Sequence, residues 1–168
     1  MKTLVITFLL LQFSIVGAYS QEAATTETMI YNPEANVNAD LAKAIAQARE
    51  DDKYVFVQIG GNWCKWCVKF HQFVNSDQQI DSMIKANYVV VKVNYDKENK
   101  NSDILNRLEH PERFGFPVFV ILKNGKRIHT QDSGYLESGA AYDKKKVMRF
   151  LQNWTVDALN PEHYKKKD

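Results

Sequence analysis

The sequence is poor in cysteine, because its 168 residues contain only two, Cys64 and Cys67. Two cysteines are too few for a small domain that depends on disulfide bonds for its fold, and a bond between them would close no large loop. An excess of charge of either sign is also absent, since 22 Lys and Arg residues stand against 20 Asp and Glu residues. This balance excludes nucleic acid as the main partner, because a nucleic-acid-binding protein needs a concentrated basic surface.

The composition that is present is typical of one globular domain. Hydrophobic residues make up 45% of the chain and charged residues 25%, which is close to the average of folded proteins and far from that of disordered chains. The length suits a single domain. No internal repeat and no low-complexity segment is visible in the sequence.

The first twenty residues are typical of a secretory signal peptide. Lys2 gives a positive start, residues 4–16 form an apolar run, and Ala18 and Ser20 place small residues ahead of a cleavage site before Gln21. The run is shorter than the roughly 20 residues that a membrane-spanning helix needs. We therefore predict a cleaved leader and an exported protein, with the periplasm as the favoured compartment and secretion as the alternative.

The chain then divides into four parts. Residues 1–20 are the expected signal peptide, and residues 21–37 are a polar stretch that we interpret as a flexible lead-in. Residues 38–159 carry the hydrophobic patterns of a folded domain, and residues 160–168 form a charged tail.

Hydrophobic spacing within the domain predicts helices that alternate with strands. The expected helices cover residues 38–50, 64–73, 76–86, 102–110 and 143–159, and the expected strands cover residues 54–59, 88–94, 117–122 and 127–130. Asn38 or Asp40 is the expected cap of the first helix. Asn124 and Gly125 separate the last two strands and are the strongest short hairpin signal. Alternating strands and helices require parallel crossovers, so we predict an α/β fold with a central mixed β-sheet and helices on both faces.

The two cysteines stand where a buried strand passes into a helix, in the sequence WCKWC at residues 63–67. The N–H groups of a helix start stabilise negative charge, and Lys65 adds a cation beside the first sulfur. We therefore expect a lowered pKa for the Cys64 thiol and enough exposure for it to attack a substrate disulfide. Cys67 lies one helical turn further along, where it can resolve the mixed disulfide. Trp66 is a candidate contact surface for a partner.

Three other interpretations of the cysteine pair compete with redox chemistry. Covalent haem attachment requires a histidine directly after the second cysteine, and Val68 in that position excludes it. A structural zinc site needs four ligands, and only Cys64, Cys67 and His71 fall on one helix face. A purely structural disulfide would constrain almost nothing. We favour redox chemistry over the last two, and expect no metal and no cofactor besides the redox-active Cys64–Cys67 disulfide.

An ordered series of segments resembles the thioredoxin superfamily. The segments are IGGNWCKWC at 59–67, VKVNYD at 91–96, FGFP at 114–117, LKNG at 122–125 and GYL at 134–136. They follow one another at family-like intervals within residues 38–158. The chain is similar to exported thioredoxin-like proteins and to the reducing terminal domain of the DsbD family, and this resemblance implies a thioredoxin-like fold.

The resemblance also implies roles for individual residues. The first cysteine matches the attacking thiol of the family and the second matches the resolving thiol. Pro117 matches the family's cis-proline, which lies against the cysteine pair and shapes a groove for an extended substrate strand. Phe116 would offer that strand backbone hydrogen bonds and an apolar wall, and Gly134 would let its backbone approach. Trp63 matches the tryptophan that precedes the first cysteine.

Two features depart from the family pattern. Gln58 stands where thioredoxins carry a buried acid that moves protons on and off the resolving thiol, so proton transfer must use water, Lys92 or another group, or be slower. Lys92 matches the family's strand lysine; without the acid it must find an acceptor, lose its proton, or extend its stem to the sheet edge. The dipeptide between the cysteines, Lys65 and Trp66, lacks the histidine of strong oxidants, which favours a reductant.

These observations predict an exported thiol–disulfide oxidoreductase that reduces or shuffles disulfide bonds in other proteins, with reductase activity favoured over oxidase or isomerase activity. The implied partners are disulfide-containing protein substrates and a membrane carrier or thiol protein that donates electrons, and we expect a monomer. The alternative is a thioredoxin-fold module that binds peptides or a metal ion without redox turnover.

Overall fold

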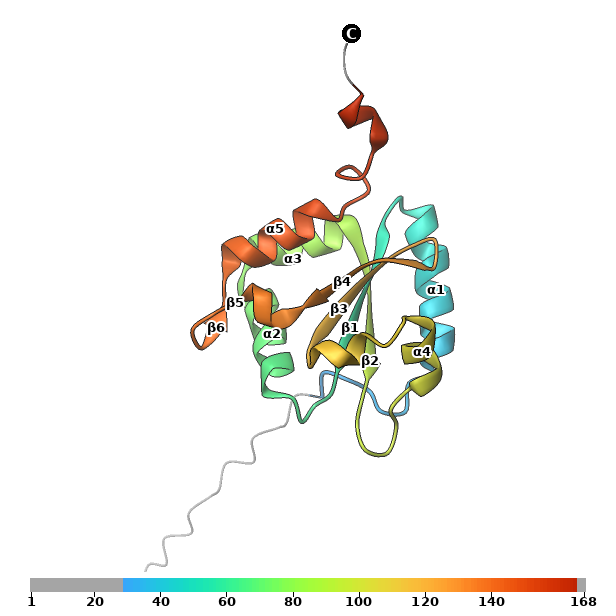
Figure 1. The fold of residues 1–168 in the computed structure, drawn as a ribbon, viewed down its shortest axis with the longest axis vertical. Helices are drawn as coiled ribbons and strands as arrows, with labels where there is room; N and C mark the ends of the chain where they lie inside the picture. Colours follow the sequence, from blue (N-terminus) through green and yellow to red (C-terminus); the bar gives the residue numbers. More distant parts are fainter. Residues whose placement is uncertain (1–28, 166–168) are drawn as a thin grey trace, which may run out of the picture.

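The computed structural model describes residues 29–165 of the chain. The expected signal peptide, residues 21–28 of the lead-in and the last three residues of the tail lie outside the described residues. The described part forms a central four-stranded sheet with helices packed on both of its faces (Figure 1). None of its helices is long and apolar enough to cross a membrane.

Helices and strands alternate along the chain as the sequence predicts. The α-helices are α1 (Val37–Glu50), α2 (Lys65–Ser76), α3 (Gln78–Asn87), α4 (Ser102–Arg107) and α5 (Lys144–Asn153). The strands are β1 (Tyr54–Gly60), β2 (Tyr88–Asn94), β3 (Val118–Lys123), β4 (Lys126–Asp132), β5 (Glu137–Ser138) and β6 (Ala141–Tyr142). Three short 3-10 helices complete the set, η1 (Pro111–Phe114), η2 (Ser133–Leu136) and η3 (Pro161–Tyr164). The β5–β6 ribbon is an addition that the sequence patterns do not predict.

The main sheet is mixed, with the strand order β2-β1-β3-β4. β1 and β2 run parallel, with Gln58 beside Lys92, whereas β3 runs antiparallel to both β1 and β4. The connection from β1 to β2 passes through α2 and α3, because parallel strands need a long crossover. Asn124 and Gly125 have φ angles of 52° and 80° and form the two-residue turn between β3 and β4, which the Asn-Gly pair predicts.

The two faces of the sheet bury different kinds of side chain. Successive residues of a strand point to opposite faces, so Tyr54 and Phe56 pack on one side of β1 while Val55 and Val57 pack on the other. The first face is rich in aromatic rings and is covered by α2, α3 and α5; the second is aliphatic and is covered by α1 and α4 (Figure 1). The predicted α/β fold with a central mixed sheet and helices on both faces is confirmed.

The far end of α2 is fixed by Asp77, which lies between α2 and α3. Its Oδ1 accepts hydrogen bonds from the N–H groups of Gln79 at 3.0 Å and Ile80 at 3.3 Å. Its Oδ2 lies 2.7 Å from the Lys144 ammonium of α5. The hydrogen bond from Lys144, aided by the two backbone N–H groups, lowers the pKa of Asp77. The helix that carries the cysteines is therefore anchored to both of its neighbours.

The first helix begins at Val37, one residue earlier than expected, and neither of the two expected N-cap residues caps it. Asn36 is the N-cap of α1, and its side chain accepts the N–H of Ala39 at 3.1 Å. Asn38, one of the expected caps, instead bonds Asp103 at 2.6 Å and Arg107 at 2.8 Å, both in α4. Its side chain joins two helices on the aliphatic face.

The last helix ends at Asn153 and not at residue 159. Trp154 leaves the helical conformation with a φ of −119°, and the Thr155 hydroxyl accepts the N–H of Ala158 at 2.9 Å. Such a side-chain bond offers the backbone an alternative to helical pairing. The Trp154 ring stacks on His129 of β4 with centroids 4.1 Å apart, so the apolar residues after the helix still pack on the sheet.

Candidate active site

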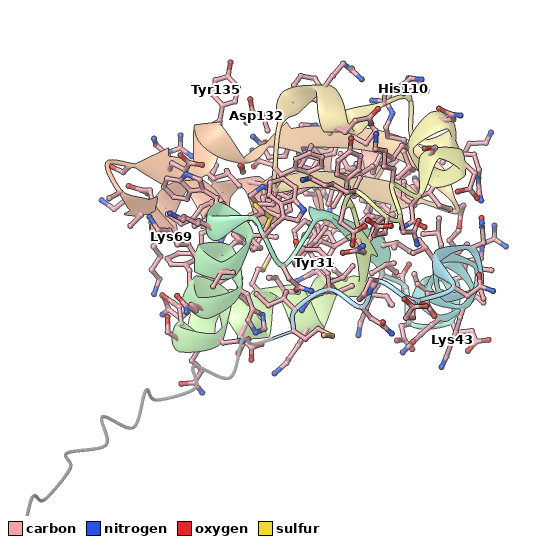
Figure 2. All side chains as sticks on the ribbon, turned by 90° about the horizontal axis from the view of Figure 1, so that it is seen from below. Tyr31, Lys43, Lys69, His110, Asp132 and Tyr135 are labelled. Carbon is pink, nitrogen blue, oxygen red and sulfur yellow. A yellow bond between two sulfur atoms is a disulfide. The ribbon has the colours of Figure 1, made fainter. Side chains whose placement is uncertain are left out.

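The two cysteines lie at the start of α2 and are joined by a disulfide bond, with Cα atoms 5.2 Å apart (Figure 2). Cys64 is the N-cap of α2, and its Sγ accepts the N–H of Cys67 at 3.1 Å. In a reduced protein this N–H and the positive end of the helix would stabilise a negative charge on the Cys64 sulfur. The position of the pair at a helix start is as the sequence predicts.

Both cysteines are largely covered by their neighbours. Cys64 is 5% exposed and Cys67 is 2% exposed. Cys64 is the more accessible of the two, as an attacking thiol should be, but its exposure is smaller than expected. The residues that pack against the pair and cover it are Ile30, Tyr31, Trp66, Val68 and Phe116.

One side of the pair is open and carries exposed aromatic surface. Trp63 is 57% exposed, and its indole N–H donates to the Tyr95 carbonyl at 2.7 Å. The ring meets Phe116 edge-on at a centroid distance of 5.6 Å, and Phe116 in turn lies 4.6 Å from the Tyr95 ring. A Cβ on Gly61 would overlap the Trp63 indole nitrogen and would lie 2.7 Å from both the Tyr95 carbonyl oxygen and the Trp63 Cδ1. Glycine therefore allows Trp63 to fold against the loop.

Trp63 and Tyr95 also line an open cavity of about 670 Å³ next to the loop that follows β2. Asp96 fixes this loop, because its carboxylate accepts the N–H groups of Glu98 at 2.9 Å and Asn99 at 2.7 Å. The side chain of Asn94 donates to the same carboxylate at 2.6 Å and is the main cause of the lowered pKa of Asp96. The wall of the cavity is thus well ordered by hydrogen bonds.

A cis peptide bond lies beside the cysteine pair, between Phe116 and Pro117. The register of β1 and β3 pairs Ile59 with Val118, which brings Pro117 level with Gly60 at the end of β1. The Phe116 ring packs against the cysteines. Phe116 therefore contacts both the cysteine pair and the Trp63 ring, whereas the role that the resemblance implies for Pro117 stays a prediction.

The other side of the pair is closed by a segment that the sequence assigned to a flexible lead-in. Ile30 and Tyr31 are buried against the cysteines. The Asn62 side chain holds them, because its Oδ1 accepts both of their N–H groups at 3.0 Å and its amide donates to the Tyr31 carbonyl at 2.8 Å. The expectation of a loose lead-in fails for these two residues, since burial and hydrogen bonds offset the entropy of ordering them. Their apolar character within a polar stretch was the one available signal.

Gly60 lets Tyr31 and Cys67 meet. A Cβ on Gly60 would overlap the Cys67 sulfur and would lie 3.0 Å from the Tyr31 hydroxyl oxygen. Both groups therefore occupy the space in front of the Gly60 Cα, and any larger residue would displace one of them. Burial raises the pKa of Tyr31 well above its ordinary value of 10.0, so its hydroxyl stays protonated at neutral pH.

A sequence profile described as Thioredoxin-like matches residues 35–124, which is more than half of the chain. The chain belongs to the thioredoxin-like family. The matched region contains α1, the cysteine pair and the cis-proline, and it ends at the turn before β4. The resemblance on which the sequence analysis relied is confirmed at the level of the family, whereas the narrower similarity to the reducing domain of DsbD stays a prediction.

Solved structures of thioredoxin-like proteins share the fold. The disulphide isomerase from Xylella fastidiosa Temecula1 has a TM-score of 0.67 and 21% identity, over 74% of this chain and 95% of that chain. A thioredoxin from Thermus thermophilus has a TM-score of 0.53 and 21% identity, over 76% and 94%. The DsbH oxidoreductase has a TM-score of 0.50 and 17% identity, over 66% and 78%. No curated protein sequence matches the chain. At these identities the likeness shows the fold alone.

The family's acid position is filled by Gln58, which is buried beside Lys92 on the β1–β2 pair. Lys92 is half-buried rather than enclosed, because β2 is an edge strand. Burial lowers the pKa of Lys92. His71 of α2 is near enough for the Lys92 charge to add to burial, the larger cause, in lowering the pKa of His71. Lys92 therefore lies on the face of the sheet that α2 covers.

Of the two residues between the cysteines, Lys65 is exposed and Trp66 is half-buried. Trp66 packs edge-on against Tyr142 of β6 at a centroid distance of 5.4 Å, and the Lys69 ammonium lies 4.3 Å from its ring. Trp66 is therefore not the exposed contact surface that the sequence analysis expected. Trp63, at 57% exposed, is the more exposed of the two rings.

Gly134 lies in η2 after β4, and its N–H already donates to Asp132 Oδ1 at 2.8 Å. A Cβ on Gly134 would meet only the Asp132 side chain, at 3.2 Å. The contacts of Gly134 are thus with Asp132 and not with the cysteines, so its expected role toward a substrate backbone stays a prediction.

The zinc alternative gains no support from the geometry. Within residues 29–165, no three His, Cys, Asp or Glu side chains converge as metal ligands would. The His71 ring instead contacts the side-chain amide of Asn75, with 3.0 Å between Nε2 and Nδ2.

Proposed function

We propose that this protein is a thiol–disulfide oxidoreductase that exchanges disulfide bonds with other proteins through Cys64 and Cys67. The observation that carries the proposal is the placement of the bonded pair, with Cys64 as the cap of α2 and its sulfur bonded by the Cys67 N–H. A bond between residues so close in the sequence adds little to stability. A pair held at a helix start therefore fits a redox cycle better than a structural cross-link.

The geometry gives each sulfur a step in the exchange. In the reduced protein the Cys64 thiolate attacks a substrate disulfide, the substrate S–S bond breaks, and one substrate sulfur leaves as a thiolate. The mixed disulfide joins Cys64 to the other substrate sulfur. The Cys67 thiol then loses its proton and attacks the Cys64 sulfur, which releases the second substrate thiolate and forms the Cys64–Cys67 bond. Two electrons pass from this protein to the substrate.

Substrate approach from the Trp63 side is supported by the exposed aromatic surface there. The Trp63 ring is mostly exposed and is braced against Phe116 and the Tyr95 carbonyl. An exposed aromatic ring held in one position can anchor a partner at low entropic cost. We propose that a protein chain carrying a disulfide docks across Trp63 and Phe116 and presents its sulfur to Cys64.

We also propose that the protein works after export, in the periplasm or as a secreted protein, and in the reducing or shuffling direction. The signal-peptide pattern of residues 1–20 and the absence of a histidine between the cysteines support this proposal. Solved structures with the same fold bear the names disulphide isomerase and thioredoxin. Outside the reducing cytosol, the dithiol would be regenerated by a membrane carrier or a second thiol protein.

Reduction of insulin by dithiothreitol, followed by turbidity, tests the reaction. Cys64→Ser should abolish the acceleration that the wild-type protein gives, and Cys67→Ser should accumulate a mixed disulfide that is visible by mass spectrometry. Ser138→Ala, an exposed change in β5, is the matched control and should retain full activity. Acceleration that survives Cys64→Ser contradicts the proposal.

Equilibration with glutathione tests the direction. A reduction potential near that of thioredoxin, about −270 mV, is expected for a reductant, whereas a value near that of DsbA, about −120 mV, belongs to an oxidant. A value of about −120 mV would be consistent with the proposed oxidoreductase activity but would contradict the proposed reducing direction.

A further inference from the structure

The cycle proposed above requires a negative charge on the Cys67 sulfur. Cys67 is a thiolate when it attacks the mixed disulfide, and it leaves as a thiolate when the Cys64–Cys67 bond is itself reduced. With Cys67 only 2% exposed, water has little access to that charge, and burial of an unpaired charge is costly. Gln58, at the family's acid position, has no proton to exchange. A hydrogen-bond donor near this sulfur would lower that cost.

The Tyr31 hydroxyl lies where such a group is needed. It and the Cys67 sulfur both crowd the space in front of the Gly60 Cα, with the hydroxyl oxygen 3.0 Å from the position that a Cβ would take. Tyr31 is 1% exposed, so its ring is enclosed. The three hydrogen bonds from Asn62 fix the backbone on both sides of the Tyr31 Cα. The hydroxyl is therefore held beside the sulfur from a segment that precedes the whole matched family region.

Two other buried tyrosines of the described chain, Tyr88 and Tyr142, use their hydroxyls differently. The Tyr88 hydroxyl donates to the Leu151 carbonyl at 2.5 Å, and the Tyr142 hydroxyl donates to the Trp66 carbonyl at 3.3 Å. Both stabilise the packing of helices on the aromatic face. Tyr31 differs because its hydroxyl is directed at the cysteine turn.

We propose that the Tyr31 hydroxyl donates a hydrogen bond to the Cys67 thiolate during disulfide exchange, and that Asn62 positions Tyr31 for this. The inference rests on the redox function proposed above. When an incoming thiolate attacks Cys64, the S–S bond breaks and its electron pair moves to the Cys67 sulfur, which then accepts the Tyr31 O–H. The proton that later neutralises Cys67 comes from water, because the buried phenol remains protonated and acts as a donor only.

The pKa of Cys67 in the reduced protein tests the proposal directly. Because the sequence contains only two cysteines, ¹³Cβ labelling of cysteine gives two NMR signals whose shifts report the two thiols against pH. Tyr31→Phe keeps the ring and removes the donor, so the Cys67 pKa should rise by about one unit, a tenfold loss of thiolate. Tyr88→Phe removes a buried hydroxyl far from the sulfurs and should leave it unchanged. Equal Cys67 pKa values in the two variants overturn the proposal.

The other ionisable groups around the pair stay in place in both tyrosine variants. They are Lys65 on the first turn of α2, His71 on its second turn, Lys92 on β2, and Tyr142 on β6, which is close enough to Tyr31 for the two phenols to affect each other. A difference between Tyr31→Phe and Tyr88→Phe therefore reports the hydroxyl. Circular dichroism confirms that each variant is folded before titration.

A double-mutant cycle tests the part assigned to Asn62. Asn62→Ala alone should raise the Cys67 pKa in the same direction as Tyr31→Phe, and should add little to it when both changes are combined. If Asn62→Ala changes the Cys67 pKa by the same amount in the wild-type protein and in Tyr31→Phe, Asn62 does not act by positioning the Tyr31 hydroxyl, and this part of the proposal is overturned. The titration needs no turnover, so it is separate from the insulin assay. Loss of insulin reduction in Cys64→Ser with no pKa change in Tyr31→Phe would keep the function and reject this inference.

Discussion

The surroundings of Cys64 and Cys67 differ although one bond joins them. Cys64 lies on the open side, next to the exposed Trp63 ring and at the helix start, where the Cys67 N–H reaches its sulfur. Cys67 lies on the closed side, behind Gly60 and against Tyr31. The spacing of the two cysteines does not by itself assign their tasks. The residues that cover each sulfur differ, and the proposed function uses this difference to assign the attack to Cys64 and the resolving step to Cys67.

The two sides are also built from different parts of the chain. The open side is made by Trp63 and by two residues that follow the pair, Tyr95 after β2 and Phe116 before β3. The closed side is made by Tyr31, which precedes the first helix. Because Tyr31 on one side and Tyr95 and Phe116 on the other come from separate segments, the contrast between the two sides can be tested by substitution.

The largest effect is expected on the closed side, at Gly60. Gly60→Ala would place a methyl group onto the Cys67 sulfur and against the Tyr31 ring. We expect a loss of about 3 kcal/mol in the free energy of unfolding of the oxidised protein, as for an overpacked core. Urea unfolding measures it, with Gly134→Ala as the control, because a Cβ there meets only the Asp132 side chain. If Gly60→Ala lowers the free energy of unfolding no more than Gly134→Ala does, the residues around Gly60 can rearrange to accept a methyl group.

The next effect concerns the hydrogen bonds between Asn62 and the segment of Ile30 and Tyr31, which closes one side of the cysteine pair. Asn62→Ala removes the three hydrogen bonds that hold Ile30 and Tyr31, and should cost about 2 kcal/mol of stability. Hydrogen exchange at the Tyr31 amide should accelerate, because its acceptor is the Asn62 side chain. Asn75→Ala, an exposed asparagine on α2 whose side chain contacts His71, should leave that amide protected. Unchanged protection of the Tyr31 amide in Asn62→Ala would mean that packing alone orders the segment of Ile30 and Tyr31.

A smaller effect, on activity alone, is expected on the open side. Trp63→Ala should lower kcat/KM for reduction of a protein disulfide by about tenfold, because an exposed anchor is lost. Reduction of a small aromatic disulfide by the same variant should change little, since such a substrate needs no docking surface. Tyr164→Ala, a similarly exposed ring in η3, is the control. Equal losses for both kinds of substrate would place Trp63 in the chemistry of Cys64 and not in docking.

The smallest effect should come from the far end of α2, which belongs to neither side. The folded pKa of Asp77 is lowered chiefly by the Lys144 hydrogen bond, so its contribution to stability is present above the unfolded pKa and is lost as the pH falls through the lower folded value. Between pH 5 and pH 3, the free energy of unfolding of Lys144→Met should therefore fall less than that of the wild-type protein. Urea midpoints across that range measure it. The Cys64 and Cys67 titrations should not move, and a shift in either would link the two ends of the helix.

Much of the fold follows from local sequence patterns. The β-branched and aromatic runs of β1, β2 and β3 are dense enough to predict strands, and the Asn124-Gly125 turn fixes the antiparallel edge. The helix start at the cysteines is equally visible, because Cys64 follows a glycine pair at the end of a buried strand. These features depend on neighbours within a few residues.

The features that the sequence did not predict depend on contacts between distant segments. Trp66 turns away from solvent because it packs on Tyr142, in a ribbon too short to leave a pattern. Tyr31 is fixed by Asn62, a residue that reads locally as part of a turn. The early end of α5 depends on a hydrogen bond of the Thr155 side chain. In each case the deciding partner could be identified only in three dimensions.

Because of the placement of Tyr31, the two ends of the described chain differ in their distance from the cysteine pair, and so in what a label attached to them would report. Its N-terminal end passes directly behind the second sulfur, whereas η3 at the C-terminal end lies at the opposite end of the molecule (Figure 1). A fluorophore attached at the exposed Met29 would sense whether the sulfur atoms are bonded or separate. The same dye beyond η3 would serve as its silent reference.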